Sequence, residues 1–303
     1  MGFLSRLLVI GGSGLVGTNL VLAARDKYDT YATFNDHRVD FDNVEELKVD
    51  VRDFQQVSAI VKAVRAETVV LTSAFMDVDG CERDPVKASE VNVMGARHVA
   101  RAVKDTALLV YISTDYVFDG KKSGRYVETD PTGPVNVYGK TKLEGEEEVR
   151  ANARDFLIVR PAQIWGENRF VKKPTLVQKV VEALRAGREI EMISDQAQSP
   201  TYAPDLANSL LDLLEAKARG VYHAAGGSAL SRHEMAVKVA EAYDLDTGLV
   251  RPVKLAAAGL PAPRPQNVAL SSAKLSALTG RAPALFEASL AEFVRGAPSG
   301  NAL

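Results

Sequence analysis

The sequence predicts an α/β protein with a doubly wound, Rossmann-like parallel sheet and a smaller C-terminal lobe. Short apolar segments alternate with amphipathic ones over the first 160 residues, which is typical of a parallel sheet covered by helices on both faces. A glycine-rich loop follows the first apolar segment. Farther along, Tyr138 and Lys142 are spaced as neighbours on one face of a helix.

Composition restricts the class of protein. The 303 residues are enough for one large domain or a domain with a smaller lobe, and 46% hydrophobic and 25% charged residues are ordinary for a globular protein. The net charge of −2 predicts no nucleic-acid or membrane-surface partner. No apolar run approaches the ~20 residues of a membrane span. The single cysteine, Cys81, excludes an intrachain disulfide. We expect a cytoplasmic protein.

The first half is predicted to contain six strands with helices between them. The expected strands are Leu7–Ile10, Thr30–Phe34, Glu46–Val49, Thr68–Leu71, Leu108–Ile112 and Phe156–Arg160. The expected helices are Gly14–Ala24, Phe54–Ala66, Val86–Lys104 and Val137–Ala151. Ligands of doubly wound sheets bind at the carboxyl ends of the strands, so residues that follow these strands are the candidates for function.

After Arg160 the alternation becomes irregular. Helices are expected at Leu176–Ala186, Asp205–Ala216 and Ser231–Tyr243, and strands at Glu189–Ile193 and Gly220–Ala225. We therefore predict a dinucleotide-binding domain of residues 1–160, joined by returning segments near 203–225. Residues 161–202 and 226–303 are predicted to form a substrate-binding lobe.

The glycine-rich loop has the spacing of a dinucleotide-binding loop. It fits both Gly-x-x-Gly-x-x-Gly and Gly-x-Gly-x-x-Gly, and it lies between an apolar strand and a helix. Glycines let the backbone approach a pyrophosphate, and the helix N-terminus supplies N–H groups and a positive dipole. A tight turn is the alternative interpretation. The predicted cofactor-binding residues here are Gly11, Gly12, Ser13, Gly14, Leu15, Val16 and Gly17.

The residues after the second expected strand bear on the cofactor type. NAD-binding proteins usually carry an acid at this strand end, whereas this strand is followed by Asn35, Asp36, His37 and Arg38. Arg38, together with His37, is suited to a 2′-phosphate. NADP(H) is therefore the favoured cofactor and NAD(H) is the alternative. These residues could also form a solvated loop that has no role in cofactor binding.

Further cofactor candidates follow the third and fourth strands. Asp50 and Val51 follow the third, where an acid can accept a hydrogen bond from an adenine amino group, although Asp is also common in turns. Ser73 and Ala74 follow the fourth strand, where small side chains suit either a nicotinamide or simple core packing.

Asn92 is unfavourable inside a helix. It is expected to bend that helix, to hold a water that relays protons to Lys142, or to be an exposed polar residue.

Candidate catalytic residues lie at the end of the fifth strand and on the next helix. Thr114 and its neighbour Ser113 place a hydroxyl where it can hydrogen-bond a substrate carbonyl oxygen. A tyrosine has an ordinary pKa of about 10, and a nearby ammonium lowers it. Tyr138 with Lys142 therefore predicts a phenol that exchanges a proton near neutral pH. Beside a dinucleotide, such a pair indicates hydride transfer to or from a carbonyl.

Other polar and aromatic residues carry weaker signals. The four histidines are scattered, so no metal site is expected. Gln163 and Trp165 follow the sixth strand and are candidates to line a substrate pocket, although a single tryptophan is more often core. A solvated helix face is expected for Glu144, Glu146, Glu147 and Glu148.

Together these residues resemble the extended short-chain dehydrogenase/reductase family, and within it the dTDP-4-dehydrorhamnose reductase branch. The resemblance covers most of the chain. Beyond the glycine loop, it rests on Ser113-Thr114-Asp115-Tyr116-Val117-Phe118-Asp119-Gly120, residues 134–146, Asp195-Gln196, Pro200-Thr201, Asp205-Leu206-Ala207 and Arg264-Pro265-Gln266-Asn267.

The resemblance implies reduction of the C4 ketone of a nucleotide-linked 4-keto-6-deoxy sugar. It implies that Tyr138 protonates the oxygen, Thr114 orients it, and Lys142 holds the nicotinamide ribose. Cofactor contacts are then expected at Asn92, Tyr138 and Lys142 as well as at the loops above. The implied substrate-binding residues are Ser113, Asp115, Phe118, Gln163, Trp165 and Arg264.

The chain departs from the family pattern around the expected substrate pocket. Gln163 stands where a substrate-contacting tryptophan is usual, and Gln198 where a small glycine is usual. Two alternatives therefore stay open: an NDP-sugar epimerase or other carbonyl reductase of this fold, and a cofactor-binding regulator similar to the beta subunit of methionine adenosyltransferase. The expected partner is a nucleotide sugar, and we allow for a homodimer.

Overall fold

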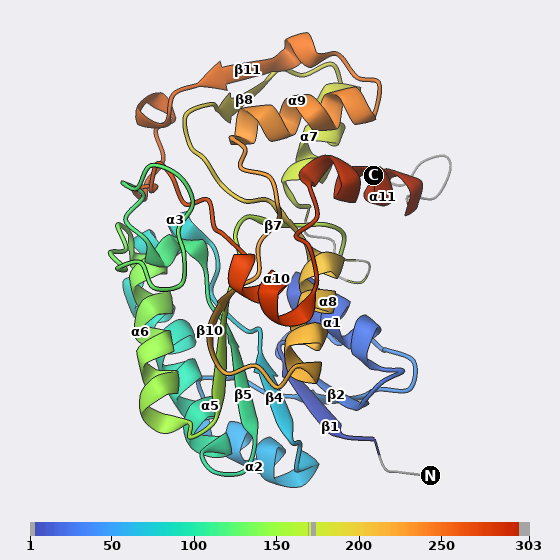
Figure 1. Cartoon of the computed structure of the whole chain (residues 1–303), viewed down its shortest axis with the longest axis vertical. Helices are drawn as coiled ribbons and strands as arrows, with labels where there is room; N and C mark the ends of the chain where they lie inside the picture. The colour runs from blue at the N-terminus through green and yellow to red at the C-terminus, as the bar shows by residue number, and fades with distance from the viewer. Residues whose placement is uncertain (1–3, 169, 171–173, 297–303) are drawn as a thin grey trace.

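The computed structural model describes residues 4–168, 170 and 174–296 of the chain. Its centre is a seven-stranded parallel sheet of order β10-β6-β5-β4-β1-β2-β3 (Figure 1). The strand order reverses between β1 and β4, the point where doubly wound sheets bind ligands. The strands are β1 (Arg6–Ile10), β2 (Asp29–Phe34), β3 (Glu45–Lys48), β4 (Thr68–Leu71), β5 (Leu108–Ile112), β6 (Phe156–Arg160) and β10 (Gly220–His223).

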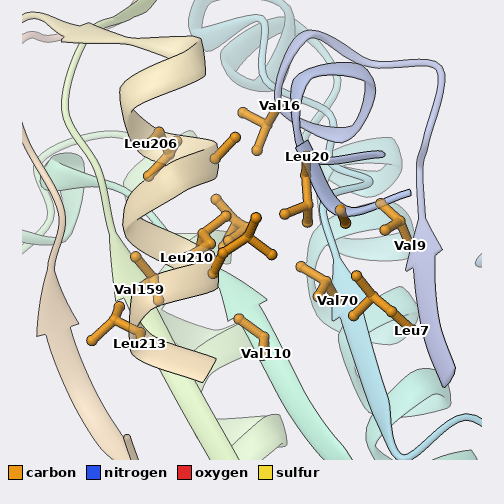
Figure 2. Close-up of a cluster of buried hydrophobic side chains, with 14 of the residues drawn as sticks. Leu7, Val9, Val16, Leu20, Val70, Val110, Val159, Leu206, Leu210 and Leu213 are labelled. Atoms are coloured by element: carbon orange, nitrogen blue, oxygen red, sulfur yellow. The ribbon is translucent and has the colours of Figure 1, made fainter. Parts of the chain in front are cut away.

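Helices cover both faces of this sheet (Figure 1). One layer holds α2 (Phe54–Val64), α5 (Gly95–Val103) and α6 (Val137–Asn152), and the other holds α1 (Leu15–Ala24), α8 (Ala203–Glu215) and α10 (Ala273–Thr279). Alternate side chains of each strand point to opposite layers. Leu7 and Val9 join the apolar cluster under α1 and α8 (Figure 2), whereas Leu8 and Ile10 join the cluster under α2 and α5.

A smaller lobe lies beyond the carboxyl ends of the strands, at the top of Figure 1. Its strands β8 (Ile190–Ile193) and β11 (Val250–Val253) pair in parallel, and its core packs around α7 (Leu176–Arg185), α9 (Arg232–Ala242) and α11 (Phe286–Gly296). The short pair β7 (Ile164–Trp165) and β9 (Thr201–Tyr202) connects the lobe to the sheet. The lobe therefore stands over the edge of the sheet where the candidate residues lie.

Short helical turns complete the carboxyl edge of the sheet. After β4 come α3 (Val78–Arg83), α4 (Pro85–Ser89) and a π-helical turn, Glu90–Met94, which runs directly into α5. The remaining turns are 3₁₀ helices at Asp115–Val117, Thr247–Leu249 and Leu255–Ala257. None of the helices in the described part of the chain is both long and apolar enough to span a membrane.

The predicted fold class is confirmed, and the first six expected strands lie within one residue of their observed bounds. The helix expected at 86–104 is wrong in detail, because the π turn interrupts it. The sequence analysis missed β7, β9, β11, α3, α10 and α11. Strand β11 contains Pro252, which argues against a strand except at a sheet edge. The division into domains stays a prediction, with β10 and α8 as the segments that return to the sheet.

Candidate active site

The glycine loop is held against the ends of three neighbouring strands. The Gly12 amide donates to the Thr33 carbonyl at 2.7 Å, and the Thr72 hydroxyl donates to the Gly11 carbonyl at 2.9 Å. Gly11 has a φ of +96°, in the region that favours glycine. A Cβ on Gly17 would lie 2.2 Å from the Gly11 carbonyl oxygen. These glycines therefore allow the first turn of α1 to pack directly on the loop.

The start of α1 is open to an anion. Its N-cap, Gly14, is exposed and supplies no side-chain cap, and the first turn carries no acid. The N–H groups of the first turn, which lack partners within the helix, therefore face outward with the positive end of the helix dipole. Such a cradle fits a pyrophosphate. The Asn168 amide nitrogen also donates to the Ser13 carbonyl at 2.8 Å, a contact that the sequence analysis missed.

Asn92 connects the loop after β4 to helix α6. Its carboxamide accepts from the Phe75 amide at 2.8 Å and donates to the Phe75 carbonyl and to the Thr141 hydroxyl, both at 3.1 Å. Asn92 is 2% exposed, so the interpretation as an exposed polar residue is wrong. It lies in the π turn, where the helix is locally widened. Ser73, just before this loop segment, packs against Gly11; Ala74 is half-buried beside it.

The candidates at the ends of β2 and β3 differ in their surroundings. Asn35, His37 and Arg38 are exposed, and the Arg38 guanidinium pairs with Asp40 at 2.8 Å. Arg52 donates to both carboxylate oxygens of Asp50 and holds the pKa of that carboxyl below its usual value. Val51 is buried, and its carbonyl lies 3.0 Å from His98 Nδ1. The structure thus adds Arg52 as a second cation at this edge.

Tyr138 and Thr114 meet because α6 approaches the turn after β5 closely. Asn136 caps α6 by accepting from the Gly139 amide at 2.8 Å. A Cβ on Gly139 would lie 2.2 Å from the Tyr116 carbonyl oxygen, so this approach requires glycine. The Tyr138 ring packs edge-on against Tyr116, and Tyr138 and Thr114 line the same pocket.

Lys142 lies one turn along α6 from Tyr138 and is 2% exposed. Its ammonium donates to the Ile112 carbonyl at 2.7 Å and sits 4.1 Å from the centre of the Tyr111 ring. Burial lowers the pKa of Lys142 to about 7, while the Glu146 carboxylate opposes that shift. Burial also raises the pKa of Tyr138 well above its usual value. The expected lowering of the tyrosine pKa is therefore wrong for the protein alone, because desolvation outweighs the opposing effect of Thr114.

Asp115 contributes a buried carboxyl beside Thr114. The Thr114 hydroxyl donates to one carboxylate oxygen at 2.9 Å. Burial raises the pKa of Asp115 to about 7, against the opposing effect of that hydrogen bond. The site therefore contains a carboxyl that titrates close to neutral pH.

A buried ionic network lies behind these residues and was missed by the sequence analysis. Glu146, expected on a solvated face, is 0% exposed and accepts from both Arg160 Nε and Nη2, at 2.8 and 2.7 Å. It also accepts from the Ser113 hydroxyl at 2.6 Å and from Arg150 at 2.8 Å. Burial opposes ionisation, but these donors hold the pKa of Glu146 below its usual value. Glu146 follows Lys142 by four residues and so lies on the same face of α6, and this spacing is the signal that would have predicted its burial.

Part of the predicted substrate set lines a pocket of about 220 Å³ at Tyr138. Asp115 and Gln163 line it, and Gln163 has a φ of +37°, a strained conformation for a non-glycine residue. Gln198, noted above as a departure from the family pattern near the expected pocket, lines it as well, and so does Arg232, which the sequence analysis did not assign. Among the described residues no group of three or more His, Cys, Asp or Glu side chains is arranged to hold a metal ion.

Two of the remaining substrate candidates, Phe118 and Trp165, lie in apolar clusters outside this pocket, so the role expected of them is wrong. Phe118 is fully buried between Tyr126 and His223, and Trp165 is fully buried in the core of the smaller lobe. Ser113 lines the pocket, although its hydroxyl donates to Glu146.

Arg264 has a structural partner outside the pocket. Its guanidinium pairs with Asp79 at 2.9 Å and donates to the Ala262 carbonyl at 2.8 Å. The ion pair joins the proline-rich segment to α3. The role of Arg264 in substrate binding stays a prediction. The burial of a side chain cannot be read from a motif, which explains why the expectations for Phe118 and Trp165 differ from the structure.

Comparison with known proteins places these features in one family. The chain is 36% identical to the dTDP-4-dehydrorhamnose reductase of Mycobacterium tuberculosis over 286 residues, which cover 92% of this chain and 88% of that protein. It is 31% identical to the dTDP-4-keto-6-deoxy-D-glucose reductase of Streptomyces niveus over 250 residues, 82% of each chain. The crystal structure of dTDP-4-dehydrorhamnose reductase from Bacillus anthracis in complex with NADP superposes with a TM-score of 0.87, at 27% identity over 97% of this chain and 99% of that one. The pattern of the RmlD substrate binding domain matches residues 5–297, and the chain belongs to this family.

Proposed function

We propose that this protein is an NADPH-dependent reductase of the C4 ketone of a nucleotide-linked 4-keto-6-deoxy sugar. The observation that carries the proposal is the meeting of Thr114, Tyr138 and Lys142 at the carboxyl end of β5. They lie at the same edge of the sheet as an open, glycine-lined helix start. The names of the relatives, and the NADP in the Bacillus anthracis structure, support the same reaction and cofactor.

The cofactor-side residues fit a dinucleotide. The first turn of α1 would hold the pyrophosphate, and Arg38, with Arg52 nearby, would meet a 2′-phosphate. Lys142 would hold the nicotinamide ribose. A bound reduced nicotinamide supplies the hydride. A cytoplasmic location and a homodimer stay predictions from the sequence.

The protein's own residues handle the proton. When the C4 carbonyl carbon gains a hydride, its oxygen gains negative charge and takes the Tyr138 proton. The raised pKa of Tyr138 keeps the phenol protonated at neutral pH, which is the form a general acid needs. The Thr114 hydroxyl hydrogen-bonds the ketone oxygen of the substrate and orients it. Lys142, one turn away, stabilises the phenolate that remains.

The test is loss of reduced-nicotinamide absorbance when the purified protein meets NADPH and dTDP-4-keto-6-deoxy-L-mannose, with NADH in parallel. We expect oxidation, faster with NADPH. Tight NADPH binding without oxidation would contradict the reductase. Copurified NAD that is unchanged after turnover of an NDP-sugar would instead indicate an epimerase.

A further inference from the structure

The pocket at Tyr138 has a second wall, which the smaller lobe supplies. Gln198 lies between β8 and β9, and Arg232 is the first residue of α9. Gln198 exchanges two main-chain hydrogen bonds with Leu230, at 3.0 and 2.9 Å, just before the Ser231 cap of α9. This pairing fixes the backbone of Gln198 relative to the start of α9, so both side chains enter the pocket from a rigid frame.

Some buried polar atoms of this wall have no hydrogen-bond partner among the described residues. The same is true of one carboxylate oxygen of Asp115, which lines the same pocket. Gln198 is 1% exposed and Asp115 is 3% exposed. Gln198 Oε1, Asp115 Oδ2 and Arg232 Nε are buried without a hydrogen-bond partner among the described residues. Buried polar groups in folded proteins are almost always hydrogen-bonded, and leaving one unpaired is costly. Two acceptors and one donor that line one pocket therefore point to a polar ligand with hydroxyl groups and an acceptor.

The charges around the pocket indicate which kind of ligand group the Arg232 guanidinium binds. No carboxylate of the described residues lies within ion-pair distance of Arg232, although its charge acts on Asp115 and Tyr116. The guanidinium is a planar fork that matches phosphate oxygens. A nucleotide-linked sugar brings both a diphosphate and ring hydroxyls to one site.

We propose that Arg232 binds the diphosphate of the substrate, and that Gln198 and Asp115 accept hydrogen bonds from hydroxyls of its sugar ring. The assignment of the sugar rests on the proposed function. Asp115 adjoins Thr114, so its free oxygen serves a hydroxyl close to the reacting ketone. Arg232 and Gln198 are then the residues through which the smaller lobe selects the substrate.

The test measures binding by calorimetry on the full chain with NADP⁺ present, so it does not depend on turnover. The probes are thymidine, dTDP and dTDP-L-rhamnose. Arg232→Ala is expected to weaken dTDP by about 10- to 150-fold, the range for a lost charge-assisted hydrogen bond, and to leave thymidine unchanged. Arg232→Lys should recover part of the loss. Arg251→Ala removes an exposed arginine of the same lobe that pairs with Glu189, and it should bind like the wild type.

Gln198→Leu separates sugar recognition from diphosphate recognition. It should weaken dTDP-L-rhamnose by about fivefold, as expected for one hydrogen bond, and leave dTDP unchanged. Equal losses for thymidine and dTDP in Arg232→Ala, or unchanged dTDP affinity, would overturn the role of Arg232. Equal losses for dTDP and dTDP-L-rhamnose in Gln198→Leu would overturn its role. If dTDP binding depends on Arg232 but NADPH is not oxidised, the reductase proposal fails while the diphosphate site stands.

Discussion

The two walls of the pocket at Tyr138 are built differently. On the sheet side, Lys142 is bound to the Ile112 carbonyl, and Glu146 connects α6 to Ser113 and Arg160. On the lobe side, Gln198 and Arg232 present buried polar atoms without a described partner. Apart from Asp115 Oδ2 and Arg160 Nη1, the polar groups on the sheet side named here are satisfied and hold that wall rigid without substrate, whereas the lobe side is completed by a ligand. The comparison assigns chemistry to the sheet side, and substrate recognition to the lobe side together with Asp115.

The largest expected effect comes from removing the proposed acid. Tyr138→Phe should reduce kcat by about 10²–10⁴-fold, because the substrate oxygen loses its proton donor. NADPH binding, measured by fluorescence titration, should be retained. Unchanged turnover would remove Tyr138 from the mechanism and with it the chemical role of the sheet side.

Breaking the network behind the sheet-side wall should cost stability. Glu146→Ala leaves Arg160 buried without its counter-ion and is expected to lower the free energy of unfolding by about 3–5 kcal/mol. Urea denaturation measures this loss. Glu147→Ala, on the exposed face of the same helix, is the matched control and should change stability by less than about 0.5 kcal/mol. Equal effects would mean that the network does not hold α6 in place.

Removing the candidate 2′-phosphate contact should have a smaller effect, on the preference for NADPH over NADH. Arg38→Ala should weaken NADPH by about tenfold and NADH hardly at all, as expected for one charge-assisted contact to a 2′-phosphate. Lys62→Ala, an exposed cation on α2, is the control. If both cofactors weaken equally, Arg38 does not read the 2′-phosphate, and Arg52 is the next candidate.

The last prediction concerns the pH dependence of stability. Because the pKa of Asp115 is raised to about 7 in the folded state, the folded protein binds more protons than the unfolded one between about pH 4 and 7. Its contribution to stability is therefore lost as the pH rises through this range. Asp115→Asn should flatten the slope of unfolding free energy against pH by up to about 1.4 kcal/mol per unit. An unchanged slope would contradict a protonated Asp115.

What the sequence could predict also differs between the two walls. The glycine loop and the Tyr138–Lys142 pair are local patterns, so their spacing was enough to predict the elements that carry them. Contacts between distant segments were not predictable, since Gln198 and Arg232 reach Asp115 only after the lobe folds over the sheet. Glu146 was misassigned for the same reason. Its burial depends on Arg160, which lies on another element.

The most direct test compares steady-state NADPH oxidation by the wild type, Tyr138→Phe and Arg232→Ala over a range of dTDP-4-keto-6-deoxy-L-mannose concentrations. Tyr138→Phe should lower kcat with little change in KM, and Arg232→Ala should raise KM with little change in kcat. A lower kcat with unchanged KM in both variants, or no oxidation by the wild type, would contradict the division between chemistry on the sheet side and recognition on the lobe side.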